Sequence, residues 1–142
     1  MSGSSGSGKN TYIKNNYTNC KVVSADDFFE TSTGYVFNHN LLGKAHAQCF
    51  RNFISFLLEN TPLIIVNNTN TSVIEIAPYV AAANAFEATI ELITLIKDPA
   101  ICAARNVHNV PLSTINRMEQ SIKNRTLPKH WNFTSIKTIT QD

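Results

Sequence analysis

The chain lacks the features that mark several large classes of protein. No apolar stretch in its 142 residues reaches the length of a membrane span, and the N-terminus has no signal-peptide core. Its three cysteines, Cys20, Cys49 and Cys102, are widely spaced and odd in number, so they form neither a disulfide framework nor a zinc pattern. We therefore expect no membrane association, reduced and partly buried thiols, and an intracellular location, cytoplasmic or nuclear.

Long runs of charge are also absent. The formal net charge of +2 is too small for a protein that coats nucleic acid or a membrane surface, so any site for a polyanion must be local. A hydrophobic content of 43% favours a globular chain over a disordered one, and the length suits one domain with a real core.

One glycine-rich run near the N-terminus carries the strongest signal of chemistry. Residues 3–10, GSSGSGKN, match the phosphate-binding pattern G-x-x-x-x-G-K-[ST] except at the last position, which is Asn10. Glycines let backbone N–H groups cradle a polyphosphate, the lysine reaches the outer phosphates, and the following helix points its positive end at them. The predicted nucleotide-binding residues are Gly3, Ser4, Ser5, Gly6, Ser7, Gly8, Lys9, Asn10 and Thr11.

A flexible Gly/Ser tail or linker is the alternative interpretation of this run. Gly8 and Lys9 stand at the right spacing, however, and residues 11–14 that follow suit a helix. We therefore favour the phosphate-binding loop.

Patterns of hydrophobicity along the rest of the chain alternate between strand and helix. Residues 31–40 are polar, contain Gly34 and predict no element. Alternating elements of this length indicate an α/β fold with a parallel sheet. The expected helices cover residues 9–16, 41–58, 73–86, 98–105 and 111–123, and the expected strands cover residues 21–24, 63–66 and 89–96.

The strand that normally leads into a phosphate-binding loop is missing. Only Met1 and Ser2 precede Gly3, and without that strand its two neighbours in the sheet would lose a shared hydrogen-bonding partner. Either the numbered chain starts inside the true reading frame or the fold tolerates a gap. We expect the truncated start.

Three further segments follow the loop in a specific order: residues 24–29 (SADDFF) after a strand, residues 64–71 (IIVNNTNT) ending a strand, and residues 104–111 (ARNVHNVP) as a lid-like turn between helices. With the loop, they resemble the AAA-type, ATP-binding P-loop kinase domain of bacteriophage-type polynucleotide 5′-kinases. They resemble still more the kinase-like domain of the animal Nedd-four-binding proteins. The resemblance covers nearly the whole chain, so we expect a kinase-like domain over residues 1–132 and a C-terminal extension over residues 133–142.

The resemblance implies a P-loop NTPase fold of the nucleotide kinase type, with flanking helices, a helical lid, and ATP and Mg²⁺ as cofactors. It implies that Lys9 neutralises charge on the transferred γ-phosphoryl group and that Arg105 reaches over the nucleotide from the lid. It also implies that Asp26, just past a strand end, accepts the proton of the attacking hydroxyl.

The acceptor-site residues have open alternatives. Asp27 supports Asp26 or caps a helix. Asn68 and Asn70, with Thr69 between them, line the acceptor site or tie the strand end to its neighbours by local bonds.

Three more residues have weaker functional signals. His46 and Arg51 match positions that are often histidine and basic in the family, although a surface or core role suits a lone histidine better, and His108 suits a structural role.

Two departures from the resemblance concern the metal and the acceptor. Asn10 and Asn67 stand where a Ser/Thr hydroxyl and a carboxylate usually hold Mg²⁺ and its water shell, which predicts a weak magnesium site. Phe29 stands where the phage enzymes carry an arginine that binds the acceptor.

The predicted function is ATP-dependent phosphoryl transfer to a hydroxyl, most plausibly the 5′-hydroxyl of a polynucleotide or nucleoside. The alternative is a nucleotide-binding pseudokinase acting as a binding module. The oligomeric state has no signal in the sequence.

Overall fold

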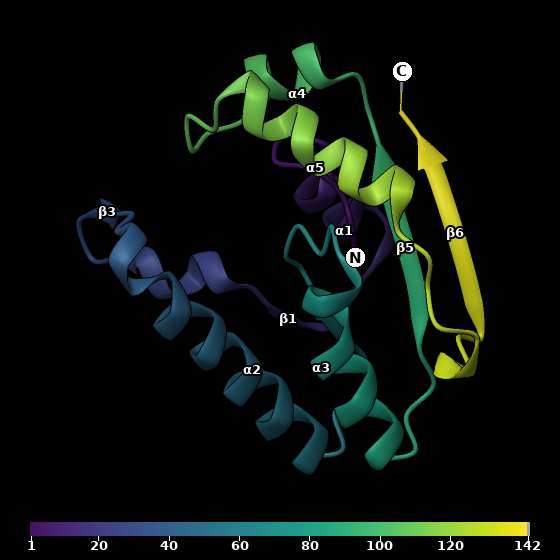
Figure 1. Cartoon of the computed structure of the whole chain (residues 1–142). Coiled ribbons are helices and arrows are strands. Elements are labelled where there is room, and N and C mark those ends of the chain that lie inside the picture. The colour runs from purple at the N-terminus through teal and green to yellow at the C-terminus, as the bar shows by residue number, and fades with distance from the viewer. Residues whose placement is uncertain (142) are drawn as a thin grey trace. The chain divides into compact units, whose positions relative to one another are not determined.

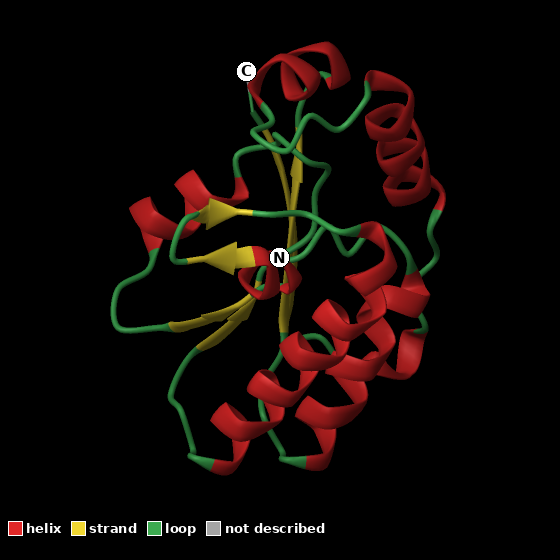
Figure 2. Ribbon diagram, turned by 90° about the vertical axis from the view of Figure 1, so that its left-hand side faces the viewer, coloured by secondary structure: helices red, strands yellow, loops and turns green. Residues whose placement is uncertain are grey.

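The computed structural model describes residues 1–141, which form two compact units (Figure 1). Unit 1 contains Met1–Asn16 and the described chain from Thr69 onward, and unit 2 is Tyr17–Asn68. The second unit is therefore an insertion between the two segments of the first. Each unit combines helices with short strands, as Figure 2 shows in red and yellow.

The sheet of unit 1 consists of β5 (Glu91–Ile96) and β6 (Ser135–Thr140). The two strands pair in parallel along their full length and lie side by side in teal and yellow in Figure 1. The side chains of β5 are buried from Leu92 to Leu95, as its apolar sequence predicts. The sequence analysis did not predict β6, which is mostly exposed and whose two isoleucines are three positions apart, without the alternation of a half-buried strand.

The predicted helices of unit 1 are confirmed, with ends that differ by at most one residue. Local capping explains the starts of two of them: Ser72 and Glu75 form a reciprocal capping box on α3, and the Asp98 carboxylate accepts hydrogen bonds at the start of α4. The helices are α1 (Lys9–Asn16), α3 (Val73–Ala85), α4 (Pro99–Arg105) and α5 (Leu112–Asn124). In Figure 1, α4 and α5 lie together near the carboxyl ends of β5 and β6.

A hydrophobic cluster joins α3 and β5 to the segment that leads into β6. Ile76 and Val80 of α3, Leu92 of β5 and Trp131 are all buried in it. Phe133 packs its ring against Trp131 with centroids 6.0 Å apart. Because Trp131 is buried in the same core as α3, residues on both sides of position 132 contribute to unit 1.

Unit 2 is built around a parallel pair of short strands and one long helix. Strand β1 (Lys21–Val23) pairs in parallel with β4 (Ile64–Val66), and helix α2 (Leu42–Leu58) packs on them. One face of α2 is buried at helical spacing, which confirms the amphipathic pattern of the sequence. That face consists of Ala45, Cys49, Phe53 and Leu57.

The segment that connects β1 to α2 contains elements that the sequence analysis missed. A 3₁₀ helix, η1 (Ala25–Phe29), is followed by β2 (Glu30–Thr31) and β3 (Gly34–Tyr35), which form an antiparallel hairpin. Residues 31–40 were expected to contain no element, so this expectation was wrong. Strands of two residues are too short to give a hydrophobic period.

The expected parallel sheet is present as small pieces. The strands of the described residues form two parallel pairs and the antiparallel hairpin. The fold is thus mixed α/β with small parallel sheets and five α-helices. Among the helices of the described chain, none is both long enough and apolar enough to cross a membrane.

Candidate functional site

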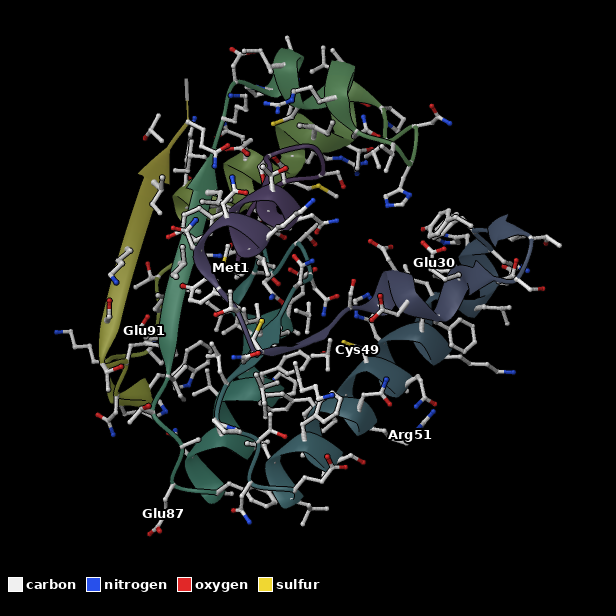
Figure 3. The ribbon with its side chains drawn as sticks, turned by 180° about the vertical axis from the view of Figure 1, so that it is seen from behind. Met1, Glu30, Cys49, Arg51, Glu87 and Glu91 are labelled. Atoms are coloured by element: carbon white, nitrogen blue, oxygen red, sulfur yellow. The ribbon has the colours of Figure 1, made fainter. Side chains whose placement is uncertain are left out.

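The glycine loop, residues 3–8, starts at the edge of β5 in unit 1. Ser2 forms a parallel bridge to Thr94: its N–H donates to Ile93 at 2.8 Å, and its carbonyl accepts from the N–H of Leu95 at 2.9 Å. Ser2 therefore occupies the place of the last residue of a strand that leads into the loop. Figure 3 shows Met1 beside β5.

The loop backbone takes conformations that suit glycine. Gly6 and Gly8 have φ of 80° and 95°, in the left-handed region where a side chain is strained. A Cβ at Gly6 would collide with the carbonyl oxygen of Cys102, and one at Gly3 would lie 2.8 Å from the carbonyl oxygen of Leu95. The glycines thus let the loop pack directly against backbone on both sides.

Lys9 is the first residue of α1 and folds back over the loop. Its Nζ donates to the carbonyl oxygens of Gly3 and Ser4, both at 2.9 Å. The N–H groups of the first helical turn have no acceptor within the helix and give this end a partial positive charge. The ammonium and the helix N-terminus together make the loop a local site for an anion. Asn10 and Thr11, which follow Lys9 on α1, are exposed.

Glu119 of α5 supports the loop from behind. It is 2% exposed, and its Oε1 accepts a hydrogen bond of 2.6 Å from the Ser4 hydroxyl, which is fully buried. Within the described chain, Glu119 Oε2 and the buried Ser7 hydroxyl make no hydrogen bond. Sequence reasoning missed Glu119, because its partner lies 115 residues away and no local pattern marks the pair.

Arg125, just past the end of α5, ties three segments to the start of the loop. Its guanidinium donates to the Ser2 hydroxyl at 2.8 Å, to the Asn70 carbonyl at 2.7 Å and to the Thr94 hydroxyl at 2.8 Å. Burial lowers the pKa of Arg125, and the charge of Glu75 partly opposes that shift. The sequence analysis missed this residue as well.

The polar residues that begin unit 1's second segment form hydrogen bonds with the start of the chain. Asn70 is buried with φ of 45°, and its amide donates to the Met1 carbonyl at 2.8 Å. The Thr69 carbonyl accepts a 3.0 Å hydrogen bond from the N–H of Gly3. These contacts join residues 69 and 70 to the segment that leads into the glycine loop.

The predicted lid is a turn between α4 and α5. Arg105 is the last residue of α4 and is exposed, as is His108 in the turn. The side chain of Asn106 closes the turn: its amide nitrogen donates to the Ala103 carbonyl at 2.8 Å, and its oxygen accepts from the N–H of Val110 at 2.7 Å. Asn106 therefore shapes the segment that carries Arg105.

In unit 2, Asp26 lies on η1 and contacts the hairpin. The hydroxyl of Tyr35 donates to Asp26 Oδ1 at 3.2 Å. Burial, followed by the nearby charge of Asp26, raises the pKa of Tyr35 to about 12, so the tyrosine remains a hydrogen-bond donor at neutral pH. Tyr35 therefore orients the Asp26 carboxylate. The sequence analysis missed it because it lies on the unpredicted hairpin.

Asp27 and Asn68 build the local frame around Asp26. Asp27 accepts from the N–H of Ser24 at 3.2 Å, which completes a capping box at the start of η1. Partial burial raises the pKa of Asp27, while the Ser24 hydrogen bond opposes the shift. Asn68 Oδ1 accepts from the N–H of Ala25 at 2.8 Å, so this amide fixes η1 to the end of β4.

The remaining predicted residues of unit 2 are Asn67, His46 and Arg51. The N–H of Asn67 donates to the Val23 carbonyl at 2.8 Å and extends the pairing of β4 with β1. His46 is exposed, and Arg51 donates to the Gln48 side chain at 2.8 Å. Figure 3 shows Arg51 and the buried Cys49 on opposite sides of α2. Both His46 and Arg51 are surface residues of the helix.

The arrangement of the glycine loop is shared with a known class of proteins. A glycine loop that follows a residue paired with a strand, and that is followed by a helix whose first residue is lysine, is typical of P-loop proteins. A family model described as an AAA domain matches residues 1–124, which is most of the chain. The chain therefore belongs to this family of P-loop NTPase-like kinase domains. Membership of the polynucleotide kinases in particular stays a prediction.

The matched range contains the loop, Asp26 and Arg105, and it ends with the last residue of α5. Families of this kind generally use ATP or another nucleoside triphosphate with Mg²⁺. Within the residues that the structure describes, no group of three or more His, Cys, Asp or Glu side chains is placed to hold a metal ion.

Proposed function

We propose that the protein transfers the γ-phosphoryl group of ATP to a hydroxyl acceptor, most plausibly the 5′-hydroxyl of a nucleoside or polynucleotide. One observation carries the proposal: in a chain of the AAA domain family, the Lys9 ammonium and the N-terminus of α1 converge on a glycine loop. Such a loop supplies the backbone donors and the positive charge that a polyphosphate needs.

The residues of the loop fit a nucleoside triphosphate. Gly6 and Gly8 have no side chain that would cover the backbone N–H groups of the loop. Lys9 supplies a cation at the loop, and within the described residues the buried Ser7 hydroxyl makes no hydrogen bond. ATP, when bound, supplies the γ-phosphoryl group. Lys9 then balances the charge of the outer phosphates, and the exposed Arg105 adds a second cation from the lid turn.

The donor set fits magnesium only weakly. Asn10 and Asn67 offer neutral amide oxygens where a hydroxyl and a carboxylate are usual. Mg²⁺ commonly keeps several water ligands and takes others from the phosphates of its nucleotide, so a protein with few ligands of its own can still use it. The metal would reduce the charge on the transferred group.

Asp26 is the proposed general base. The acceptor hydroxyl gives its proton to the Asp26 carboxylate as its oxygen forms a bond to the γ-phosphorus, and the bond from that phosphorus to the ADP oxygen breaks. Because Tyr35 donates to Oδ1, it fixes the orientation of the carboxylate that takes the proton. The step yields ADP and the phosphorylated acceptor.

Transfer of label from γ-labelled ATP to thymidine and to a 5′-hydroxyl oligonucleotide tests the proposal. Wild-type protein should label at least one of these acceptors, and Lys9→Ala should label neither. Lys14→Ala is the matched control, since Lys14 is an exposed lysine on the same helix. Equal labelling by the wild type and Lys9→Ala would contradict the role of the loop.

A nucleotide-binding pseudokinase is the second candidate, favoured by Asn10 and Asn67 at the metal positions. If the amides weaken Mg²⁺ binding, Asn10→Ser and Asn67→Asp should each lower the magnesium concentration that half-maximal ATP binding requires. A hydroxyl restores the usual ligand and a carboxylate attracts the divalent ion. Calorimetric ATP titrations across a magnesium series decide it, and unchanged magnesium dependence would remove the best support for the pseudokinase.

A further inference from the structure

Unit 2 contains an aromatic cluster whose members are Phe28, Phe29, Tyr35 and Phe37. Phe29 is 3% exposed and forms its centre. Its ring contacts the other three in edge-to-face geometry, with centroids 5.1 Å away for Phe37, 5.4 Å for Phe28 and 6.1 Å for Tyr35. These contacts hold the rings in fixed orientations on η1 and the hairpin.

The outer rings of this cluster remain open to solvent. Phe28 is 37% exposed and Phe37 is 52% exposed, and Val36 beside Phe37 is 60% exposed. Exposed aromatic side chains that a buried neighbour holds rigidly are suited to binding another ring, because little side-chain entropy is lost on contact.

The aromatic cluster is joined directly to the proposed general base. Tyr35 contacts the Phe29 ring and also donates its hydroxyl to Asp26 at 3.2 Å. Tyr35 thus links the aromatic cluster to the Asp26 carboxylate, and Phe28 follows Asp26 by two residues on η1.

The charge around the cluster disfavours an anionic acceptor. Residues 22–43 contain no Lys or Arg, but they contain Asp26, Asp27 and Glu30, all exposed. The Lys and Arg residues of unit 2 are Lys21, Lys44 and Arg51. Lys21 lies over the Phe56 ring at 5.7 Å from its centroid, Arg51 is bound to Gln48 on α2, and Lys44 is exposed on the first turn of α2, outside the acidic segment. A phosphate held near Asp26 would meet like charges at short range.

We propose that the acceptor is an uncharged hydroxyl compound with a planar aromatic ring, such as a nucleoside, and that its ring stacks on the aromatic cluster while its hydroxyl meets Asp26. The inference rests on the proposed function and narrows it: a free nucleoside is preferred to an acceptor that carries a phosphate next to the reacting sugar.

Binding of thymidine, measured by calorimetry or ligand-observed NMR, tests the inference without requiring turnover. A non-hydrolysable ATP analogue with Mg²⁺ is present in excess, so that thymidine cannot occupy the nucleotide site. Thymidine should bind about 10-fold more tightly than thymidine 3′-monophosphate, which adds one dianion near the carboxylates, and 2-deoxyribose should not bind measurably.

Phe37→Leu is the variant of choice, since leucine keeps an apolar contact with Phe29 but removes the stacking face. It should weaken thymidine binding by about 5- to 150-fold, the range that loss of one base–aromatic stack produces. Phe86→Leu is the matched control, because Phe86 is 41% exposed and lies at the end of α3 in unit 1. It should leave thymidine binding unchanged.

Several results would overturn the inference: no thymidine binding, equal or tighter binding of the 3′-monophosphate, or no effect of Phe37→Leu. Loss of self-association in Phe37→Leu, together with no thymidine binding by the wild type, would assign the cluster to a protein interface instead. Thymidine binding that depends on Phe37 without any transfer from ATP would uphold the inference and contradict only the proposed phosphoryl transfer.

Discussion

The glycine loop of unit 1 and the η1–hairpin segment of unit 2 are built in opposite ways. Ser2, Ser4 and Ser7 are completely buried, and residues far along the chain hold the loop from behind. Asp26 and Phe37, in contrast, are exposed and are held by neighbours within about one helical turn or one hairpin. The loop is thus buried in the core of its unit, while Asp26 and Phe37 lie at the surface of unit 2 on a segment that Asn68 and the buried Phe29 anchor.

Substitutions in the two regions should therefore have different effects on stability and on binding. A change at the loop disturbs buried hydrogen bonds and backbone contacts, so it should reduce both stability and nucleotide binding. A change at an exposed residue of η1 or the hairpin, such as Asp26 or Phe37, meets mainly solvent, so it should alter acceptor binding or the rate while the fold survives.

The largest expected effect is on turnover at the exposed segment. Asp26→Asn removes the proposed base and should lower the rate of phosphoryl transfer by about 100- to 10,000-fold. Its unfolding free energy should barely change, because Asp26 is exposed and an Asn oxygen still accepts from Tyr35. Rates with labelled ATP and urea titrations measure the two quantities. Glu30→Gln, which removes a nearby exposed carboxylate, should retain activity.

A pair of glycine substitutions compares the regions directly. Gly6 and Gly34 both have positive φ, at 80° and 122°, but a Cβ at Gly6 would meet the Cys102 backbone and one at Gly34 would meet open space. Gly34→Ala should cost about 1–2 kcal/mol from backbone strain, and Gly6→Ala should cost about 2–5 kcal/mol, since overpacking adds to the strain. Urea unfolding measures both, and equal costs would contradict the contrast.

Arg125→Ala probes the support behind the loop. It removes three hydrogen bonds, to Ser2, Asn70 and Thr94, and should lower the unfolding free energy by about 2–3 kcal/mol. ATP binding should weaken as well, because Ser2 leads into the loop. Thermal unfolding and ATP titration are the measurements. Lys123→Ala changes an exposed cation in the last turn of α5, just before Arg125, and should have little effect.

The smallest expected effect is a dependence of stability on pH. Because the folded state raises the pKa of Asp27 above its ordinary value of 3.8, the folded protein binds this proton more tightly than the unfolded chain. The resulting contribution to the unfolding free energy is present below pH 3.8 and is lost as the pH rises through the folded pKa. Asp27→Asn should flatten that part of the profile in urea titrations between pH 3 and 6. An unchanged slope would show that another group causes it.

The parts of this architecture that could be predicted from the sequence are those marked by local sequence patterns. The run GSSGSGK, the apolar strands and the amphipathic α2 are each contained in a short window, and the structure places elements there. Glu119 and Arg125 gave no signal, because each acts on a partner more than 100 residues away in sequence. The hairpin with Tyr35 was missed because two-residue strands have no period, and β6 because its pairing with β5 is entirely non-local.

A calorimetric titration of ATP and Mg²⁺ into the wild type, Lys9→Ala and Asp26→Asn separates nucleotide binding by the loop from acceptor chemistry at Asp26. The proposed mechanism assigns nucleotide binding to the glycine loop and acceptor chemistry to Asp26. It therefore predicts that Asp26→Asn binds ATP like the wild type, while Lys9→Ala binds it at least about 100-fold more weakly, as expected when a preorganised cation for the phosphates is lost. Wild-type affinity in Lys9→Ala, or an equal loss of affinity in both variants, would contradict it.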